Sequence, residues 1–196
     1  MKFFTLESYF AWHEFHDRKT LYAIFDDYKQ HLQNMQGLLP DNVITLAELP
    51  GVSDGLVVRI NHERDIQYLK LTLRCGDSEM GYYDLVLEYL DAFVLPEHDQ
   101  LLAWIARGTK GHRDYACDLN RHEVDQAEGG RIEHRFLFNP GICFTIQCRE
   151  LRWVQIEKRD RRIPTLRDRY PGGPEAIEPE DFYVAMSKVW KPIFPP

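Results

Sequence analysis

Two histidines near the start of the chain, His13 and His16, are spaced so that a helix would place both imidazoles on one face. With the carboxylate of Asp17 beside them, such a pair can bind a divalent metal ion. A stable metal site needs a third and usually a fourth ligand, and the spacing of the remaining histidines does not identify one. We therefore predict no metal site and no cofactor.

The cysteines do not complete such a site. None of them belongs to a C-x-x-C pair, and Cys143 and Cys148 are separated by an odd number of positions. In a regular strand this spacing points the two side chains to opposite faces. We expect all of the thiols to be ordinary buried side chains: Cys75, Cys117, Cys143 and Cys148.

Two loops bring acidic and basic side chains together and could support general acid–base chemistry. They are HERD, residues 62–65, and GTKGHRD, residues 108–114. Neither has a recognisable nucleophile or oxyanion-binding device, and GTKG is too short for a phosphate-binding loop. We therefore assign no catalytic residue. The alternative function is a small hydrolase or metal-dependent enzyme that uses one of four histidines: His13, His16, His62 or His112.

The stretch from Cys75 to Ala106 has seven acidic side chains and none of the 24 lysines and arginines of the chain, whose net charge is −7. One interpretation is a solvated hairpin edge and helix whose acids serve solubility. The other is an acidic surface for a cationic partner, contacted by six residues: Asp77, Glu79, Tyr82, Asp84, Glu88 and Asp91. From strand parity and the hydrophilic loop after Cys75, we expect Asp84, Glu88 and at least one of Asp77 and Glu79 to lie on an exposed face.

Hydrophobic periodicity predicts the elements that position these residues. A helix is predicted within residues 17–37 with a stop at Gly37, and a shorter aromatic-rich helix precedes it, joined near Asp17. Two strands then form a hairpin in which Cys75 lies opposite Gly81 and Lys70 lies opposite Val86. Alternation predicts one inward-facing set on these strands: Leu69, Leu71, Leu73, Cys75, Tyr83, Leu85, Leu87 and Tyr89.

The second half of the chain continues the sheet. We predict a short helix near residues 97–107, and a long last strand with a bulge near Arg149 or Glu150. The whole is a single domain, residues 1–196, of class α+β, in which N-terminal helices pack on a meandering, mainly antiparallel sheet. Its parts are a helical part at 1–37, a sheet at 56–158 and a tail at 159–196 with a C-terminal closing helix.

The N-terminal MKFFTLESYF, with the strand that closes in CGD and the following GYYDLVLEY, resembles a family of small bacterial proteins. Members open with a basic residue, aromatics and threonine, and carry a meandering sheet. The family has no established activity, so the resemblance transfers no site residue. It implies a bacterial origin and a cytoplasmic location.

Small acidic bacterial proteins without a catalytic signature are often immunity proteins, which cover the active site of a toxin. We therefore predict a non-enzymatic protein-binding module, most concretely an immunity-type protein that neutralises a cationic toxin or effector. We do not expect nucleic-acid binding, because the mixed-charge run at 157–169 belongs to an acidic chain. No segment approaches the roughly 20 apolar residues of a membrane span. The sequence does not determine the oligomeric state.

Overall fold

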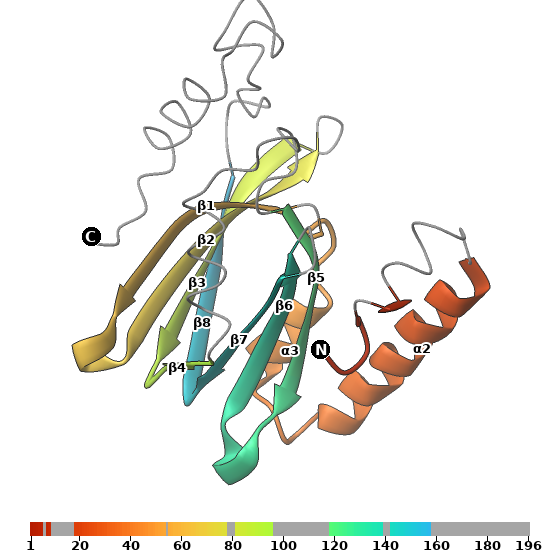
Figure 1. Ribbon diagram of the computed structural model, residues 1–196, viewed down its shortest axis with the longest axis horizontal. Helices are drawn as coiled ribbons and strands as arrows, with labels where there is room; N and C mark the ends of the chain where they lie inside the picture. The colour runs from red at the N-terminus through yellow and green to blue at the C-terminus, as the bar shows by residue number, and fades with distance from the viewer. Residues whose placement is uncertain are drawn as a thin grey trace, which may run out of the picture.

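The computed structural model describes residues 1–5, 7–8, 18–53, 55–77, 81–95, 118–138 and 142–157. Within these ranges the chain has the predicted α+β architecture (Figure 1). The helices are α2 (Arg18–Met35) and α3 (Asp41–Ala47), and the strands are β1 (Gly55–Glu63), β2 (Tyr68–Asp77), β3 (Gly81–Leu90), β4 (Phe93–Val94), β5 (Asp118–Gln126), β6 (Ile132–Phe138), β7 (Ile142–Cys148) and β8 (Glu150–Glu157). The predicted helix near 97–107, the C-terminal helix and most of the predicted first helix lie outside these ranges.

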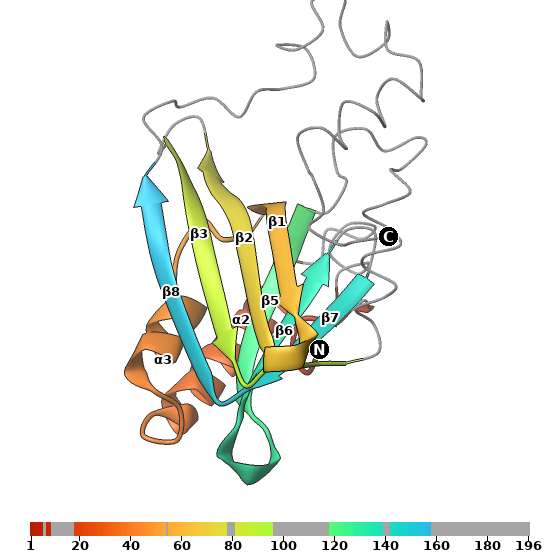
Figure 2. The same cartoon turned by 90° about the vertical axis from the view of Figure 1, so that its left-hand side faces the viewer.

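The strands pair antiparallel in the order β4-β7-β6-β5-β1-β2-β3-β8. Strands β1 and β5 meet at just two described residue pairs, Gly55 with Leu119 and Leu56 with Asp118. The sheet folds over at this short junction, so that β1, β2, β3 and β8 face the remaining strands (Figure 2). We call the first group the front layer and the group β4 to β7 the back layer.

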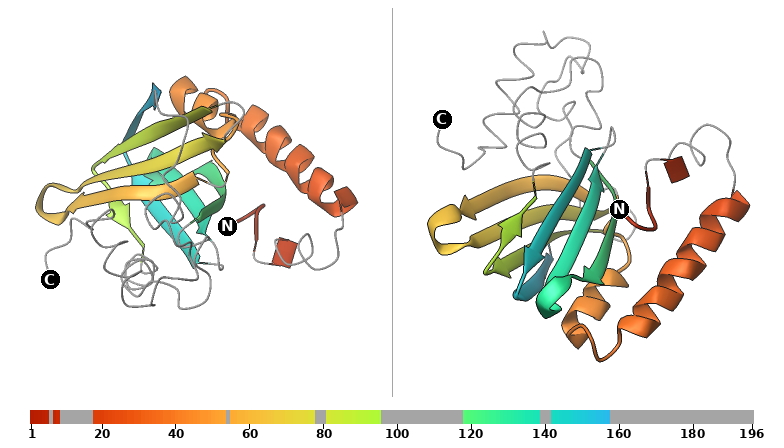
Figure 3. Two further views of the ribbon diagram at one scale, coloured as in Figure 1. Left: turned by 90° about the horizontal axis from the view of Figure 1, so that it is seen from above. Right: turned by 60° about the horizontal axis from the view of Figure 1, so that its bottom comes forward.

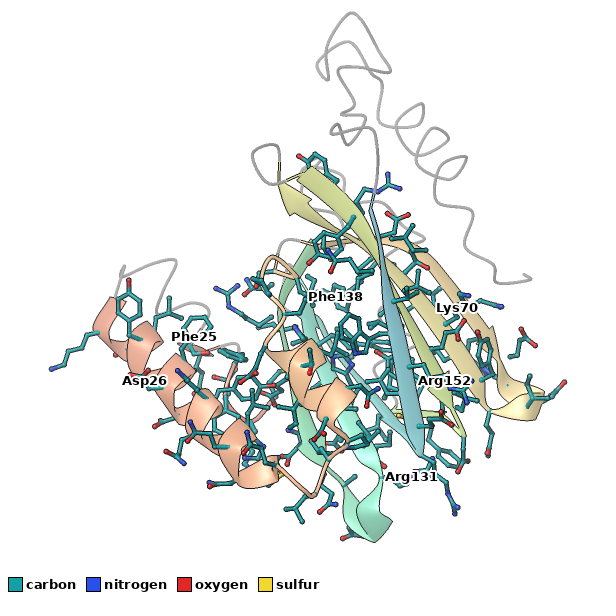
Figure 4. All side chains as sticks on the ribbon, turned by 180° about the vertical axis from the view of Figure 1, so that it is seen from behind. Phe25, Asp26, Lys70, Arg131, Phe138 and Arg152 are labelled. Carbon is teal, nitrogen blue, oxygen red and sulfur yellow. The ribbon has the colours of Figure 1, made fainter. Side chains whose placement is uncertain are left out.

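The hydrophobic core lies between the two layers. The alternation predicted for β2 and β3 is confirmed, because its inward-facing side chains are buried, the leucines completely. The back layer contributes aromatic side chains from β6 and β7, and Figure 4 shows one of them, Phe138, in the interior. Full burial of one such side chain stabilises the fold by about 1.5–3 kcal/mol. The largest fully buried core residues are Tyr89, Phe136, Phe138, Phe144, Leu46, Leu69, Leu71, Leu73, Leu85, Leu87 and Leu119.

The predicted register of the β2–β3 hairpin is wrong by two residues. Asp77, not Cys75, lies opposite Gly81, because the loop occupies only residues 78–80. Lys70 therefore lies opposite Glu88 and not Val86. A shift of two keeps every side chain on its predicted face, since side chains alternate with a period of two.

The predicted long last strand is two strands. The chain bends at Arg149, near the predicted bulge, and passes from β7 in the back layer to β8 in the front layer. The Arg149 N–H donates to the Leu90 carbonyl at 3.1 Å, which holds the bend against the end of β3. The bend also reverses the parity of the strand, so that Leu151 is buried in the core.

The helices cover the side of the two layers. Helix α2 ends at Met35, and the predicted stop, Gly37, follows two residues later with a φ of +80° that favours glycine. It lies beside the strands (Figure 3), and its Tyr28 hydroxyl accepts a hydrogen bond from the Val124 N–H at 2.8 Å. Helix α3 reaches β8, where the Asn42 side chain donates to the Leu151 carbonyl at 2.9 Å. No helix in the described part of the chain is long and apolar enough to cross a membrane.

Candidate functional site

Asp84, a predicted partner contact, is buried rather than exposed. Its Oδ1 lies 2.9 Å from the Arg74 Nε directly across the hairpin, and the whole residue is 7% exposed. The expectation failed because β3 is not an edge strand: β8 pairs along its other side and places Ile156 opposite Asp84. An Asp84→Lys substitution would therefore disturb the fold as well as the surface.

Glu88 lies on the same outer face and keeps about a third of its side chain exposed, at 32%. The Lys70 Nζ is 2.7 Å from its Oε1, and the Tyr68 hydroxyl donates to the same oxygen at 3.1 Å. The hydrogen bond from Lys70 lowers the pKa of Glu88. Burial raises the pKa of Tyr68, and the hydrogen bond to Glu88 raises it further.

Asp91 lies at the other end of β3 with a left-handed φ of 51°. Its Oδ2 is 3.0 Å from the Arg131 Nη1 and 2.8 Å from the Arg149 Nε. The Arg131 guanidinium also lies over the Phe93 ring, 4.6 Å from its centroid. Asp91 thus joins the end of the front layer to two cations, one on the approach to β6 and one at the β7–β8 bend.

The other predicted contacts are less informative. Tyr82 is half-buried and pairs with Gly76. Asp77 is the last residue of β2, but its side chain is not described, and Glu79 lies outside the described residues. The acidic-surface interpretation would also use Tyr83 and Tyr89 as aromatic anchors, but both side chains face the core and cannot contact a partner.

Three of the seven acids between Cys75 and Ala106 form ion pairs with cations from elsewhere in the chain. Asp84, Glu88 and Asp91 each have a lysine or arginine nitrogen within 3.0 Å, and every one of those cations comes from outside the stretch. Antiparallel pairing places the complementary charges on neighbouring strands. This part of the acidic stretch is therefore largely neutralised within the fold.

Among the described side chains on the strands of the front layer, the most exposed large apolar ones lie on the outer side of β8. Val154 is 51% exposed and Ile156 is 47% exposed, and the two share one face of the strand. Glu150 and Arg152 precede them on that face and pair with each other at 2.6 Å. Figure 4 shows Arg152 near Lys70, on the front-layer side of the molecule. We call Glu150, Arg152, Val154 and Ile156 the β8 surface.

The sequence analysis missed the β8 surface, although a signal for it was present. Leu151 and Trp153 have the opposite parity to the inward residues of β7, and this parity change predicts Val154 and Ile156 on the outside. The local pattern does not show which strand β8 pairs with, or that β8 lies at the end of the sheet. Both depend on the long-range topology of the chain.

A buried chain of polar side chains links the two layers in the core. The Tyr89 hydroxyl on β3 is 2.9 Å from the His134 Nδ1 on β6, and the His134 Nε2 is 3.0 Å from the His122 Nδ1 on β5. Tyr89 and His134 are 0% exposed and His122 is 8% exposed. Burial lowers the pKa of His122 to about 4 and that of His134 well below its ordinary range, and it raises the pKa of Tyr89. Both imidazoles are therefore neutral near pH 7.

Neither of these histidines was among the sequence candidates. Their positions on β5 and β6 have the inward parity of Val124 and Phe136, so alternation alone indicates buried imidazoles. Their pairing with each other and with Tyr89 required knowledge of which strands face one another.

The histidines proposed from the sequence do not converge in the described structure. His13, His16 and His112 lie outside the described residues. His62 is on β1, opposite Leu69. The described part of the chain contains no group of three or more histidine, cysteine, aspartate or glutamate side chains arranged to hold a metal ion. No observation in this part favours the hydrolase or metal-enzyme alternative.

Comparison of the chain with protein-family models, with curated proteins and with solved structures finds no match. The resemblance to small bacterial proteins therefore stays a hypothesis, and the function has to be argued from the chain itself.

Proposed function

We propose that the protein is a non-enzymatic protein-binding module that contacts its partner through the β8 surface. The observation that carries this proposal is the combined exposure of Val154 and Ile156 on the last strand of the sheet. Exposed β-branched side chains on an edge strand are a liability in a monomer, since they promote association. Binding to a partner would cover these side chains and give them a function.

An edge strand offers a specific way to bind a partner. An extended segment can add to a sheet edge through main-chain hydrogen bonds while its side chains contact the flanking face. Among the described strands, β8 pairs only with β3. Helix α3 covers the start of β8, because Trp153 Nε1 donates to the Asn42 carbonyl at 2.8 Å. Val154 and Ile156 lie beyond this contact, toward the end of the strand.

The most specific form of the proposal is an immunity-type protein that neutralises a cationic toxin or effector. The net charge of −7 supports a basic partner, since long-range attraction raises the rate of association. The contact itself would be mainly apolar, because the predicted acidic contacts Asp84, Glu88 and Asp91 are in ion pairs. Those acids would then contribute to orientation of the partner more than to affinity.

Site-specific photocrosslinking in source cells tests the proposal. A benzophenone amino acid at position 156 should capture one basic protein, and the same probe at Tyr22, which is 62% exposed on α2, should not. Adding Val154→Lys to the position-156 protein should abolish the adduct through charge repulsion. Equal capture from both positions, or a captured protein that binds the Val154→Lys variant unchanged, would show that the β8 surface is not the binding site.

A further inference from the structure

The hydrogen-bond directions in the Tyr89–His134–His122 chain follow from counting donors and acceptors. A neutral imidazole has one N–H donor and one acceptor nitrogen, and a phenol O–H can donate or accept. If His134 carried its proton on Nδ1, the Tyr89 hydroxyl would accept, and its own hydrogen would point into a fully buried core. If His134 carries its proton on Nε2, Tyr89 donates to Nδ1 and Nε2–H donates to the His122 Nδ1.

In the second arrangement one donor, the Nε2–H of His122, does not bond to another of the three side chains. His122 is the most exposed of the three. Buried donors are nearly always satisfied, whereas a group at the rim can bond to water. The structure therefore assigns the Nε2–H tautomer to both histidines.

This arrangement has no place for an additional proton. A proton on the His122 Nδ1 would face the His134 Nε2–H, donor against donor, at a separation of 3.0 Å. A proton on the His134 Nδ1 would face the Tyr89 hydroxyl and turn the phenol hydrogen away from its acceptor. In either case a buried donor loses its partner, which typically costs about 1–3 kcal/mol in addition to the cost of burying the charge.

The surroundings offer little compensation for a buried imidazolium. On β5, His122 is flanked by Arg121, which disfavours a positive charge, and by Glu123, which favours one. The Glu123 carboxylate is already bonded to Arg135, at 3.0 Å. On β7 the titratable group near Tyr89 is the Cys148 thiol, and burial raises its pKa to about 12, so it is neutral.

We propose that the Tyr89–His134–His122 chain is an acid-sensitive latch, which keeps the packing between the two layers closed around Tyr89 while both imidazoles are neutral and loosens it locally when either is protonated. The latch connects β3 of one layer to β6 and β5 of the other. The β1–β5 junction lies near the level of Arg74 and Asp84, whereas the latch is at Tyr89, toward the other end of β3. The chain itself crosses between the layers near Tyr89, from β3 to β4 and from β7 to β8, so the loosening is local and the layers stay joined.

Two buried thiols report opening at different places. Cys148 is 0% exposed, near Tyr89, whereas Cys75 is 1% exposed and sits at the junction, against Val52 and Gly55. Release of the latch should expose Cys148 and leave Cys75 covered. Global unfolding would expose both thiols together.

The experiment is thiol labelling with 4,4′-dithiodipyridine, which reacts in acid as well as at neutral pH, followed by peptide mapping. A His122 pKa near 4 in the closed state and an ordinary value in the open state predict that the labelling rate of Cys148 rises at least about 20-fold between about pH 7 and pH 5, and protonation of His134 would add to this. The rate for Cys75 should rise much less. Equal acceleration of the two thiols, or none for Cys148, would overturn the latch.

A neutral variant provides the matched control. In His122→Asn/His134→Gln the amides can reproduce the same donors and acceptors but cannot be protonated, so labelling of Cys148 should lose most of its acid acceleration. If this variant does not fold, nitrogen-15 NMR of the wild-type imidazoles decides the question. Both rings should be neutral Nε2–H tautomers at about pH 6, and a Nδ1–H tautomer or an imidazolium in either ring would refute the proposal.

Discussion

Arg74 and Asp84 lie directly opposite each other on β2 and β3, with the guanidinium Nε 2.9 Å from the carboxylate Oδ1. The arginine immediately precedes the stretch that contains no cations, and the aspartate lies within it. Cations that are absent from the stretch in sequence are thus supplied in three dimensions by neighbouring segments, at Asp84, Glu88 and Asp91.

The first prediction concerns this pair. Asp84→Ala should lower the free energy of unfolding by about 1–3 kcal/mol, because the Arg74 guanidinium, 24% exposed, would lose its partner. In the Arg74→Ala background the same substitution should cost much less. Urea unfolding of the four proteins of this double-mutant cycle measures the coupling. The exposed Glu150–Arg152 pair is the control, and Glu150→Ala should have no measurable effect.

The second prediction concerns the core between the layers. Truncation of Leu71, Leu73, Leu85 or Leu87 to Ala should each lower the free energy of unfolding by about 2–5 kcal/mol, because all four side chains are 0% exposed. Val154→Ala on the β8 surface should change it by less than about 0.5 kcal/mol. Losses below about 1 kcal/mol at all four leucines would contradict the layer arrangement.

These leucines show how much of the fold can be predicted from the sequence. Inward and outward faces follow from a period of two, and this information is local, so the parity of β2 and β3 was predicted correctly. Register depends on the length of the turn, and a loop of residues 78–80 does not carry a strong turn signal, so the pairing of Lys70 was predicted wrongly.

The candidate site shows where prediction from sequence ends. Exposure of Asp84 depended on whether β3 was an edge strand, and the strand that covers it, β8, lies more than sixty residues further along the chain. The same holds for His122 and His134, whose inward direction can be predicted locally. Their contact with Tyr89 arises only because β3 faces β6 across the core.

The third prediction is a pKa measurement on Glu88. Because Lys70 donates to its carboxylate, the pKa of Glu88 should be below the ordinary value in the folded protein, and Lys70→Met should raise it. Because the pKa of Glu88 is lower in the folded state, the Lys70–Glu88 interaction stabilises the fold at pH values above the ordinary glutamate pKa. This stabilisation is lost as the pH falls through the folded-state pKa. Carboxyl NMR titration of wild type and variant measures the shift. An unchanged Glu88 pKa in Lys70→Met would rule out Lys70 as its main cause.

The fourth prediction concerns the attachment of the N-terminal segment. The carboxylate of Glu123 is 0% exposed, accepts hydrogen bonds from the Lys2, Phe3 and Phe4 N–H groups, and pairs with Arg135. Glu123→Ala should lower the free energy of unfolding by about 3–5 kcal/mol, since it leaves three backbone donors without their acceptor and removes one of the carboxylates that pair with Arg135, which keeps Asp125 and Glu133. Glu123→Gln keeps one acceptor oxygen and should cost less.

The expected loss of stability in Glu123→Ala should be accompanied by a local change in the packing of the N-terminal segment. The Phe4 ring packs 5.1 Å from the Tyr28 ring, centroid to centroid, and should leave it when the backbone bonds are lost. Ring-proton chemical shifts of Phe4 would report this change. Glu128→Ala, at an exposed position between β5 and β6, is the control and should change neither quantity. Full stability of Glu123→Ala would mean that the N-terminal segment is held by other contacts.

The last prediction concerns the junction that joins the two layers. A Cβ atom on Gly55 would lie 2.8 Å from the Val52 carbonyl oxygen and 2.9 Å from the Cys75 Sγ, which is closer than packed atoms tolerate. Gly55→Ala should therefore lower the free energy of unfolding by about 1–3 kcal/mol. Cys75→Ala removes the sulfur but not the carbonyl oxygen, so in that background the substitution should cost less without becoming neutral. Gly37→Ala, where the strain is in the backbone and no atom lies within 4 Å of the added Cβ, should cost the same in both backgrounds. Urea unfolding of these variants measures the coupling between the two positions. If Gly55→Ala costs the same with and without the Cys75 sulfur, contact with that sulfur is not the reason that the junction needs a glycine.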